Sequence, residues 1–509
     1  MKNNSKIICL VLSSLLFTTI IHCQDSLYLI GTITGESTTD MITDVKGIGD
    51  INGDGYDDFI VSSGYHTVKL YLGSSNFNLT PDIIFHYPDK ESLNSIGGGA
   101  GIGDVNGDGY NDFLLRGSFY DVGGKGKVFL FYGGPKIDTI PVKIFSEPWI
   151  QDWFGHTMQG VGDINKDGYA DFVIGSPYNW TDGKGRVYLF WGGDTISWER
   201  CTTFTSDSLG DQFGSSVANI GDINGDGYDD LAIGAPQSGK VYIYYGGKTL
   251  HTTPDSILTA DHLDVHFGRK IESSVNVRKN GVMPFFIGGL NNVFVYNGLT
   301  QLIKPIMNNG YDFCSGDDIN GDGYYDLIMG NKNGINVYYS NPDGFDTTVD
   351  CGIPRIDSLI GFGSNISIAG DINGDGFAEI FALAPNWPNV DYPQGIITIY
   401  SHKRFTSVKG RKEITPSKYE LYQNFPNPFN PNTVINYQLL VTCYVNLKVY
   451  DMLGREIKTL VDEKQNAGMY RVNFNGSNLA SGIYFVRFTS TSQEGFIPFT
   501  KTMKMLMIK

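Results

Sequence analysis

Short runs of alternating apolar residues recur along most of the chain, and aromatic and β-branched residues dominate them. The clearest examples read VKLYL, KVFLFY, RVYLFW, KVYIYY, NVFVY, INVYY and IITIY, and each ends close to Gly or a polar turn residue. Such alternation, bounded by turn residues, is typical of β-strands. No helical period of useful length accompanies these runs. The pattern therefore predicts an all-β chain.

An acidic phrase close to D-x-N-x-D-G-Y-x-D recurs between these strands. It occurs six times, and its first residues are Asp50, Asp104, Asp163, Asp222, Asp318 and Asp371. The intervals between them are 54, 59, 59, 96 and 53 residues. Because the fourth interval is nearly twice the others, it should contain one more copy. Residues 266–298 keep the apolar runs without the acidic phrase, so the repeat has seven units.

Each unit reads as a strand, an acidic turn, a strand, a Gly or Pro turn, a strand and a looser fourth strand. A period of this length with four short strands predicts a propeller blade, and seven units predict a seven-bladed β-propeller over residues 24–405. An open solenoid or a string of separate modules is the alternative. Closure is favoured because the array is short and has no capping repeat. The strand-like residues 26–35 are expected to complete the last blade.

The acidic phrase has the spacing of a cation-binding loop. Positions 1, 3 and 5 carry side-chain oxygens, Gly at position 6 permits a sharp turn, position 7 offers its carbonyl, and the acid at position 9 closes the shell. Oxygen ligands of these kinds suit Ca²⁺, and Mg²⁺ ranks second. The alternative, a solvated Asn-Gly or Asp-Gly turn, explains the glycines but not three acids per loop. An EF-hand is excluded because position 12 is never acidic and no flanking helices are predicted.

We therefore expect about six structural Ca²⁺ ions, one per loop. In this interpretation the Tyr and Phe at position 7 contribute only their carbonyls. The predicted ligands are Asp50, Asn52, Asp54, Tyr56, Asp58; Asp104, Asn106, Asp108, Tyr110, Asp112; Asp163, Asn165, Asp167, Tyr169, Asp171; Asp222, Asn224, Asp226, Tyr228, Asp230; Asp318, Asn320, Asp322, Tyr324, Asp326; and Asp371, Asn373, Asp375, Phe377, Glu379.

Two further motifs carry a family resemblance. LAIGAP follows one acidic loop at residues 231–236, and Phe-Gly precedes several loops, as at Phe154-Gly155 and Phe213-Gly214. With the loops, these motifs resemble the FG-GAP repeat of the integrin α-subunit propeller, over about residues 26–405. The resemblance implies calcium in hairpins on one face of a seven-bladed propeller and partner binding mostly on the other. The unit at 266–298 departs from the pattern and should bind no metal.

The C-terminal residues form a separate pattern. Residues 406–418 are polar and basic and read as a linker, and residues 419–509 alternate as strands with Gly or Asn turns, which predicts a small immunoglobulin-like β-sandwich. The segments NFPNPFN (424–430), YDMLGRE (450–456) and SGIY (481–484) resemble the type A C-terminal sorting domain of the type IX secretion system. That resemblance implies export across the outer membrane, with contact between residues 419–509 and the secretion machinery. An ordinary adhesion module is the alternative.

The N-terminus predicts export, and the net charge excludes some classes of partner. Residues 1–23 have the pattern of a signal peptide, and Cys23 is a candidate for lipidation, although His22 fits that poorly. The net charge of -16 argues against nucleic acid and anionic membranes as partners. No later stretch is long and apolar enough to span a membrane, so we expect a secreted or surface protein. Cys201, Cys314, Cys351 and Cys443 show no metal spacing and read as buried free thiols, with a Cys314–Cys351 disulfide as the alternative.

No catalytic motif is visible, so we expect a non-enzymatic binding or adhesion module with an unidentified protein or glycan ligand. The alternative is an extracellular enzyme that degrades polysaccharide or protein in the propeller channel, which needs a convergent acid and base there. His156 and His266 lie beside Phe-Gly pairs and are expected to pack between blades. The aromatic cluster around the third unit is expected to be core rather than a sugar platform: Trp149, Trp153, Tyr178, Trp180 and Trp198.

Overall fold

The computed structural model of the chain describes most of residues 27–508. It leaves out residues 1–26, 38–39, 65–66, 87–97, 118–125, 148–152, 179–181, 261–265, 274–283, 302–304, 308–311, 341–344, 346, 357–358, 360, 389–392, 403–418, 422–423, 425–426, 428, 430, 440–442, 466–467, 478, 492–498 and 509. The predicted signal peptide (1–23), the linker (406–418), Trp149 and Trp180 lie outside the described residues.

The chain divides into two compact units, residues 1–404 and 405–509. Apart from one 3-10 turn at Trp198–Arg200, the elements found in the described residues are strands, which confirms the all-β prediction. In the described part of the chain, none of the helical segments has the length and hydropathy of a membrane span.

The described strands of the first unit form seven antiparallel sheets, which we number 1 to 7. Sheet 1 contains β2 (Ile42–Gly49), β3 (Asp58–Ser63), β4 (Thr67–Tyr71) and β5 (Ile83–His86); sheet 2, β6 (Gly99–Gly103), β7 (Asp112–Arg116), β8 (Lys127–Phe131) and β9 (Lys143–Ser146); sheet 3, β10 (Thr157–Gly162), β11 (Asp171–Ser176), β12 (Arg186–Phe190) and β13 (Cys201–Thr205); sheet 4, β14 (Ser216–Asn219), β15 (Leu231–Ala235), β16 (Lys240–Tyr244) and β17 (Ser256–Thr259).

The remaining three sheets follow the same order. Sheet 5 contains β18 (Lys270–Ser273), β19 (Pro284–Gly288), β20 (Asn292–Asn297), β21 (Thr300–Gln301) and β22 (Ile306–Met307); sheet 6, β23 (Phe313–Ser315), β24 (Leu327–Asn331), β25 (Gly334–Tyr338) and β26 (Cys351–Pro354); sheet 7, β27 (Asn365–Ile368), β28 (Ile380–Ala384), β29 (Ile396–His402) and β1 (Leu27–Thr34).

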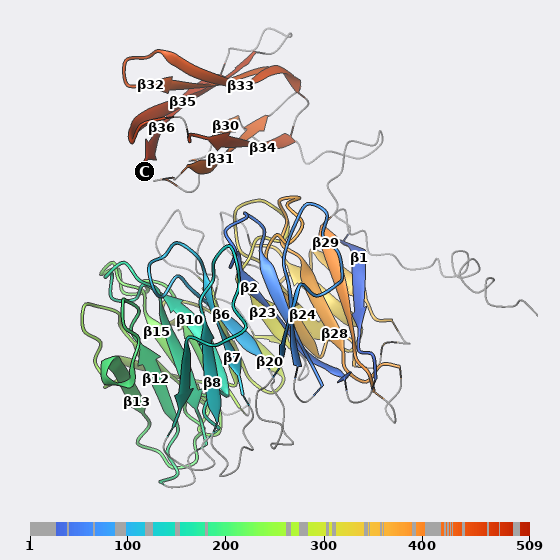
Figure 1. The fold of residues 1–509 in the computed structure, drawn as a ribbon, viewed down its shortest axis with the longest axis vertical. Helices are drawn as coiled ribbons and strands as arrows, with labels where there is room; N and C mark the ends of the chain where they lie inside the picture. Colours follow the sequence, from blue (N-terminus) through green and yellow to red (C-terminus); the bar gives the residue numbers. More distant parts are fainter. Residues whose placement is uncertain are drawn as a thin grey trace, which may run out of the picture. The chain divides into compact units, whose positions relative to one another are not determined.

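The contacts between sheets close them into a ring, in which β2 of sheet 1 lies beside the strands of sheet 7 (β28 and β29 in Figure 1). The first strand of each sheet contacts the first strand of the next, and β27 of sheet 7 contacts β2 of sheet 1. The N-terminal strand β1 pairs with β29, from Leu27 opposite His402 to Thr34 opposite Ile396. This pairing confirms that the strand-like residues 26–35 complete the last sheet. An array of six four-stranded sheets and one five-stranded sheet in this arrangement is consistent with a β-propeller.

The Phe-Gly and GAP motifs meet between neighbouring sheets. Phe213 is fully buried, and Gly214 donates its N–H to the carbonyl of Gly234 at 2.9 Å. A Cβ added to Gly234 would lie 2.0 Å from the carbonyl oxygen of Gly268 in sheet 5. A Cβ added to Gly175 would likewise lie 2.5 Å from the carbonyl oxygen of Gly214. Both positions therefore require glycine because the backbone of the next sheet passes directly over them.

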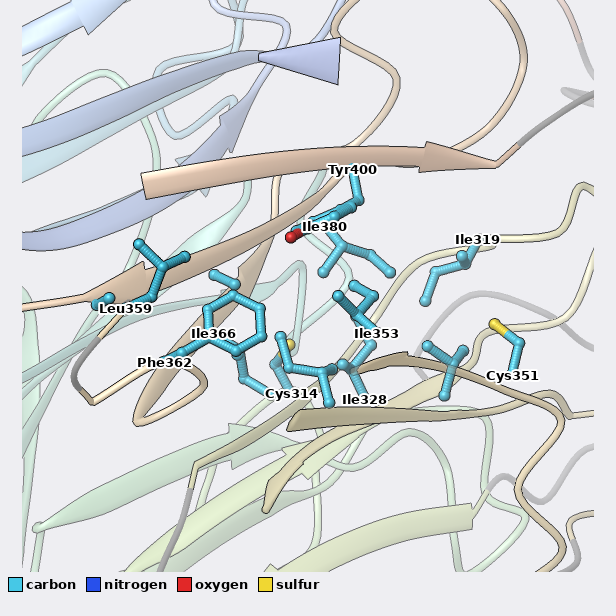
Figure 2. Close-up of a cluster of buried hydrophobic side chains, with 14 of the residues drawn as sticks. Cys314, Ile319, Ile328, Cys351, Ile353, Leu359, Phe362, Ile366, Ile380 and Tyr400 are labelled. Atoms are coloured by element: carbon cyan, nitrogen blue, oxygen red, sulfur yellow. The ribbon is translucent and has the colours of Figure 1, made fainter. Parts of the chain in front are cut away.

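Apolar side chains fill the space between sheets. Between sheets 6 and 7, Figure 2 shows Ile328 and Ile353 facing Ile366 and Ile380, with Cys314 and Cys351 in the same cluster. Cys201, Cys314, Cys351 and Cys443 are free thiols, so the alternative of a Cys314–Cys351 disulfide was wrong.

The predicted core role of the aromatic cluster holds for one member. Trp198 lies 5.1 Å from Phe190 and 6.3 Å from Phe145, measured between ring centroids, and packs against the core. Trp153 and Tyr178 are half-buried and pair with each other at 4.4 Å. They do not belong to the buried clusters found in the described residues. The interpretation as core therefore applies to Trp198 and not to this pair.

The second unit contains two sheets in its described residues. One contains β30 (Glu420–Leu421), β31 (Asn432–Leu439) and β34 (Gly468–Asn475); the other contains β33 (Glu456–Gln465), β32 (Cys443–Asp451), β35 (Gly482–Thr491) and β36 (Phe499–Met507). Side chains from both sheets, including Tyr437, Leu447 and Phe488, belong to one buried cluster. The two sheets therefore share a core, as the predicted β-sandwich requires.

Candidate metal centres

The six acidic loops occupy equivalent places in six sheets. Each connects the first strand of its sheet to the second, as residues 50–58 connect β2 to β3, and all six are described. The corresponding connection in sheet 5, residues 274–283, is outside the described residues and reads SVNVRKNGVM in the sequence. The fold thus brings the repeated acids to the same end of their sheets.

The aspartate at position 1 organises the turn. Asp50 Oδ1 accepts the N–H of Gly53 at 2.7 Å, and its Oδ2 accepts the N–H of Gly55 at 2.8 Å. The equivalent pair of bonds is accepted by Asp104, Asp222, Asp318 and Asp371. Asp163 instead accepts the N–H groups of Asp167 and Gly168. Positive φ at the glycine of position 6, 92° at Gly55, allows the chain to curl around this carboxylate.

Positions 3 and 5 continue the same network. Asn52 Oδ1 accepts the N–H of Asp54 at 2.8 Å, and Asp54 Oδ1 accepts the N–H of Tyr56 at 3.0 Å. The other five loops repeat both bonds, at Asn106 and Asp108, Asn165 and Asp167, Asn224 and Asp226, Asn320 and Asp322, and Asn373 and Asp375. These loops therefore have one shared conformation, set by their own side chains.

The acid at position 9 anchors the loop in the protein interior. Asp58 is fully buried; its Oδ2 accepts the N–H of Ile51 at 2.9 Å, and its Oδ1 accepts that of Gly73 at 2.8 Å. Asp112, Asp171, Asp230 and Asp326 make equivalent bonds. Glu379 instead accepts the N–H of Ile372 and the side-chain amide of Asn373. Position 9 thus ties five of the six loops to the turn that follows the third strand of the same sheet.

Charge is crowded in these loops. Burial raises the pKa of Asp58 to about 7. The acids at positions 1 and 5 add to this rise, and backbone hydrogen bonds oppose it. The same causes raise the pKa of Asp112, Asp171 and Asp230 to about 7, and burial raises that of Glu379 to about 9. A bound cation would relieve this crowding, so the donor chemistry fits an oxygen-preferring metal.

The side chains alone do not form a closed cage. Among the described residues, no three or more His, Cys, Asp or Glu side chains are grouped closely enough to hold a metal ion. The predicted shell also needs the Asn oxygen of position 3 and the carbonyl of position 7. Calcium at the six loops therefore stays a prediction at this point.

The aromatic residue at position 7 has a role that the sequence interpretation missed. A Cβ added to Gly53 would lie 2.7 Å from the Tyr110 ring of the next sheet. The same contact joins Gly107 to Tyr169, Gly374 to Tyr56 and Gly321 to Phe377, and the Lys166 ammonium lies 5.0 Å from the centre of the Tyr228 ring. Five of the six rings therefore cover position 4 of the preceding loop, a packing role beside the predicted carbonyl ligation, which stays a prediction.

Backbone hydrogen bonds join the same pairs of loops. Asp57 N–H donates to the Asp371 carbonyl at 3.1 Å, and Ala170 N–H donates to that of Asp104 at 2.9 Å. Asp57 also accepts the N–H of Asp371 through its own carboxylate at 2.8 Å. Together, the contacts of the position 7 rings with position 4 of the preceding loop and the backbone hydrogen bonds between loops form a continuous series, which we call the loop chain. It runs from sheet 6 through sheets 7, 1, 2 and 3 to sheet 4, where a Cβ added to Gly225 would meet no described atom within 4 Å.

Sheet 5, which lacks the acidic loop, has an ion-pair cluster instead. Lys270 Nζ lies 2.7 Å from Asp312 Oδ1 and 3.2 Å from Glu272 Oε1, and Asp312 Oδ2 accepts the N–H of Ile366 at 3.1 Å. The cluster therefore links sheets 5, 6 and 7. Burial alone would raise the pKa of Asp312, but Lys270 beside it holds that pKa below its usual value. No motif marks this pairing, since Lys270 and Asp312 are 42 positions apart along the chain.

The first strands of the sheets line a cavity of about 840 Å³. Its lining includes the ammonium of Lys270 and the carboxylate of Glu272, which no sequence motif marks. His156 also lines it, and does not simply pack between sheets as expected. Burial, with a smaller effect of Arg116, lowers the pKa of His156 to about 4, so its imidazole is neutral at pH 7.

Comparison with known families agrees with these features. The family described as FG-GAP repeat matches residues 154–190 and 213–244, and that described as FG-GAP-like repeat matches 50–115 and 318–382. The family described as Secretion system C-terminal sorting domain matches residues 423–497. The chain therefore contains FG-GAP repeats and a type IX sorting domain. Sheet 5, which lacks the acidic loop, lies outside the FG-GAP matches.

Integrin α-subunits are among the similar proteins. Integrin alpha-6 of Homo sapiens is 36% identical over 162 residues, 30% of this chain and 14% of that protein. Integrin alpha-8 of Mus musculus is 31% identical over 31% of this chain and 17% of that protein. Integrin alpha pat-2 of Caenorhabditis briggsae is 29% identical over 40% of this chain and 18% of that protein. The chain thus spans less than a fifth of these relatives. A chain of the crystal structure of BBS1N in complex with ARL6DN aligns with 75% of this chain and 98% of its own, at a TM-score of 0.45 and 13% identity.

Proposed function

We propose that this exported protein is a calcium-stabilised, seven-bladed β-propeller that acts as a binding or adhesion module at the cell surface or in the medium. The sorting domain indicates export to the surface or secretion. The observation that carries the rest is the repetition of one oxygen-rich loop in six sheets of a ring. In this proposal the seven sheets are the blades, and β1 closes the ring by pairing with β29.

The ion would be held by positions 1, 3, 5, 7 and 9 of each loop. When bound, Ca²⁺ supplies two positive charges against the three acids of the loop. In five loops the buried acid at position 9 transmits this stabilisation to the sheet, since it accepts backbone N–H groups from both the loop and the turn after the third strand, as Asp58 does from Ile51 and Gly73. The loop chain then connects each site to its neighbour.

A binding role is favoured over catalysis by the state of the cavity. Lys270, one of the cations that line it, already contacts two carboxylates, which hold it protonated and make it a poor general base. The alternative, an extracellular enzyme that degrades polysaccharide or protein, would use the same cavity with Glu272 or His156. The ligand of the binding module would be a protein or a glycan.

The C-terminal unit would be an immunoglobulin-like β-sandwich at residues 419–509 that contacts the type IX secretion machinery. Its two sheets with a shared core suit this assignment. Because the match to the sorting family spans residues 423–497, it covers most of the unit.

The test is thermal unfolding of the full chain in excess calcium and in EDTA, with bound calcium counted by elemental analysis. The proposal predicts six ions, one per loop, and a large drop in melting temperature in EDTA. An equal melting temperature with no bound ion would show that the loops are bare turns.

A further inference from the structure

The tip of the β32–β33 hairpin in the C-terminal unit presents two apolar side chains to solvent. Met452 is 68% exposed and Leu453 78% exposed, which places them among the most exposed large apolar residues of the described chain. Single exposed apolar residues are common, but hairpin turns usually contain Gly, Asn, Asp or Ser. Two adjacent large apolar residues at a turn therefore need an explanation other than folding.

The turn that carries them is held rigidly. Asp451 Oδ1 accepts the N–H groups of Leu453 and Arg455, each at 2.9 Å, and Asp451 Oδ2 accepts the Arg455 Nε–H at 2.7 Å. The Asp451 N–H donates a further bond to the Arg455 carbonyl at 3.0 Å, and Gly454 has a φ of 75°. These bonds fix the backbone without covering either side chain, so the apolar pair is presented in one orientation.

We propose that this tip, residues 452–455, is a docking element that inserts Met452 and Leu453 into an apolar pocket of the outer-membrane export machinery. The occupant follows from the unit itself, because the tip lies inside the segment that matches the sorting family, whose partner is that machinery. A rigid turn loses little conformational entropy on docking, which favours binding by a small contact. The inference rests on the proposed role of residues 419–509 as the export signal.

The test is export of the full chain from a bacterium that has a type IX system. Met452→Ser with Leu453→Ser should lower the amount of protein on the surface and in the medium about tenfold or more, with accumulation in the periplasm. The reversed pair, Met452→Leu with Leu453→Met, keeps an apolar tip and should be exported normally. Ile140→Ser with Leu209→Ser removes two apolar residues, each 71% exposed, from the first unit and should also be exported normally.

Three outcomes would overturn the proposal: normal export of the serine variant, equal loss in the Ile140 and Leu209 control, or loss in the reversed pair. A photo-crosslinker at position 453 gives a second readout that does not depend on the folding of the serine variant. It should capture an outer-membrane protein; capture of a second copy of this chain, or no adduct, would also overturn it. If deletion of residues 419–509 leaves export intact, the proposed role of the domain fails instead.

Discussion

Sheets 4 and 5 are neighbours in the ring, yet different interactions secure them. Sheet 4 has an acidic loop whose conformation depends on Asp222, Asp226 and Asp230, and it forms one end of the loop chain. Sheet 5 has no such loop, and Lys270 links it through Asp312 to sheets 6 and 7. A protonated lysine carries its positive charge without a metal, so the two sheets should respond differently to calcium.

The largest expected effect is the response of the acidic loops to pH and chelation. Without metal, the pKa of Asp58, Asp112, Asp171 and Asp230 is raised to about 7 in the folded chain. The folded state then binds more protons than the unfolded state, so this stability is present below about pH 4 and is lost as the pH rises through 7. In EDTA the melting temperature should therefore fall between pH 5 and 7.5.

Calcium should reverse that trend, because the ion replaces the protons on the same carboxylates. Differential scanning calorimetry of the full chain at several pH values, with and without EDTA, measures both curves. If the two curves stay parallel, the raised pKa values and the cation sites do not involve the same groups.

The next effect tests sheet 5. Lys270→Met leaves Asp312 and Glu272 close together without their shared cation, and it should destabilise the chain by about 3 kcal/mol. Because no metal takes part, the loss should be the same in calcium and in EDTA, as measured by urea unfolding. Lys69→Met, which removes the partner of Asp40 at 3.0 Å, is a control for the loss of an ion pair outside sheet 5. A loss that appears only in calcium would contradict the distinction between the two sheets.

A smaller effect is expected from one loop alone. Asp226→Ala removes the acceptor of the Tyr228 N–H at 2.9 Å and one predicted ligand of sheet 4. It should cost about 1–2 kcal/mol in calcium without abolishing the fold, since five other loops remain. In EDTA the difference from the unaltered chain should shrink. An unchanged melting curve in calcium would count against a cation at this loop.

Regular features of this molecule were predictable from its sequence, and contacts between distant residues were not. The period of the acidic phrase predicted the strands and the place of each loop, because one local conformation repeats. The glycine at position 4 and the aromatic residue at position 7 were visible too, but their contact joins successive repeats, as Gly53 and Tyr110 show. Lys270 and Asp312 are 42 positions apart and carry no motif, so only the folded ring brings them together.

The smallest expected effect concerns Lys166, which replaces the usual glycine at position 4 in sheet 3. Its φ of 59° is unfavourable for a lysine, whereas its ammonium stabilises the contact with Tyr228 by about 0.5–1 kcal/mol. Lys166→Gly removes both effects and makes the unfolded chain more flexible, so the melting temperature in EDTA should hardly change.

Calcium binding should respond more than stability does. The Lys166 ammonium would lie 3.4 Å from a Cβ at Gly227, inside the acidic loop of sheet 4, and a positive charge there opposes a bound cation. Lys166→Gly should therefore lower the calcium concentration that gives half of the stabilisation. Lys166→Asn, which also tolerates positive φ, removes the charge but keeps a side chain and should have the same effect. If only the glycine variant responds, backbone strain rather than charge separates this loop from its neighbours.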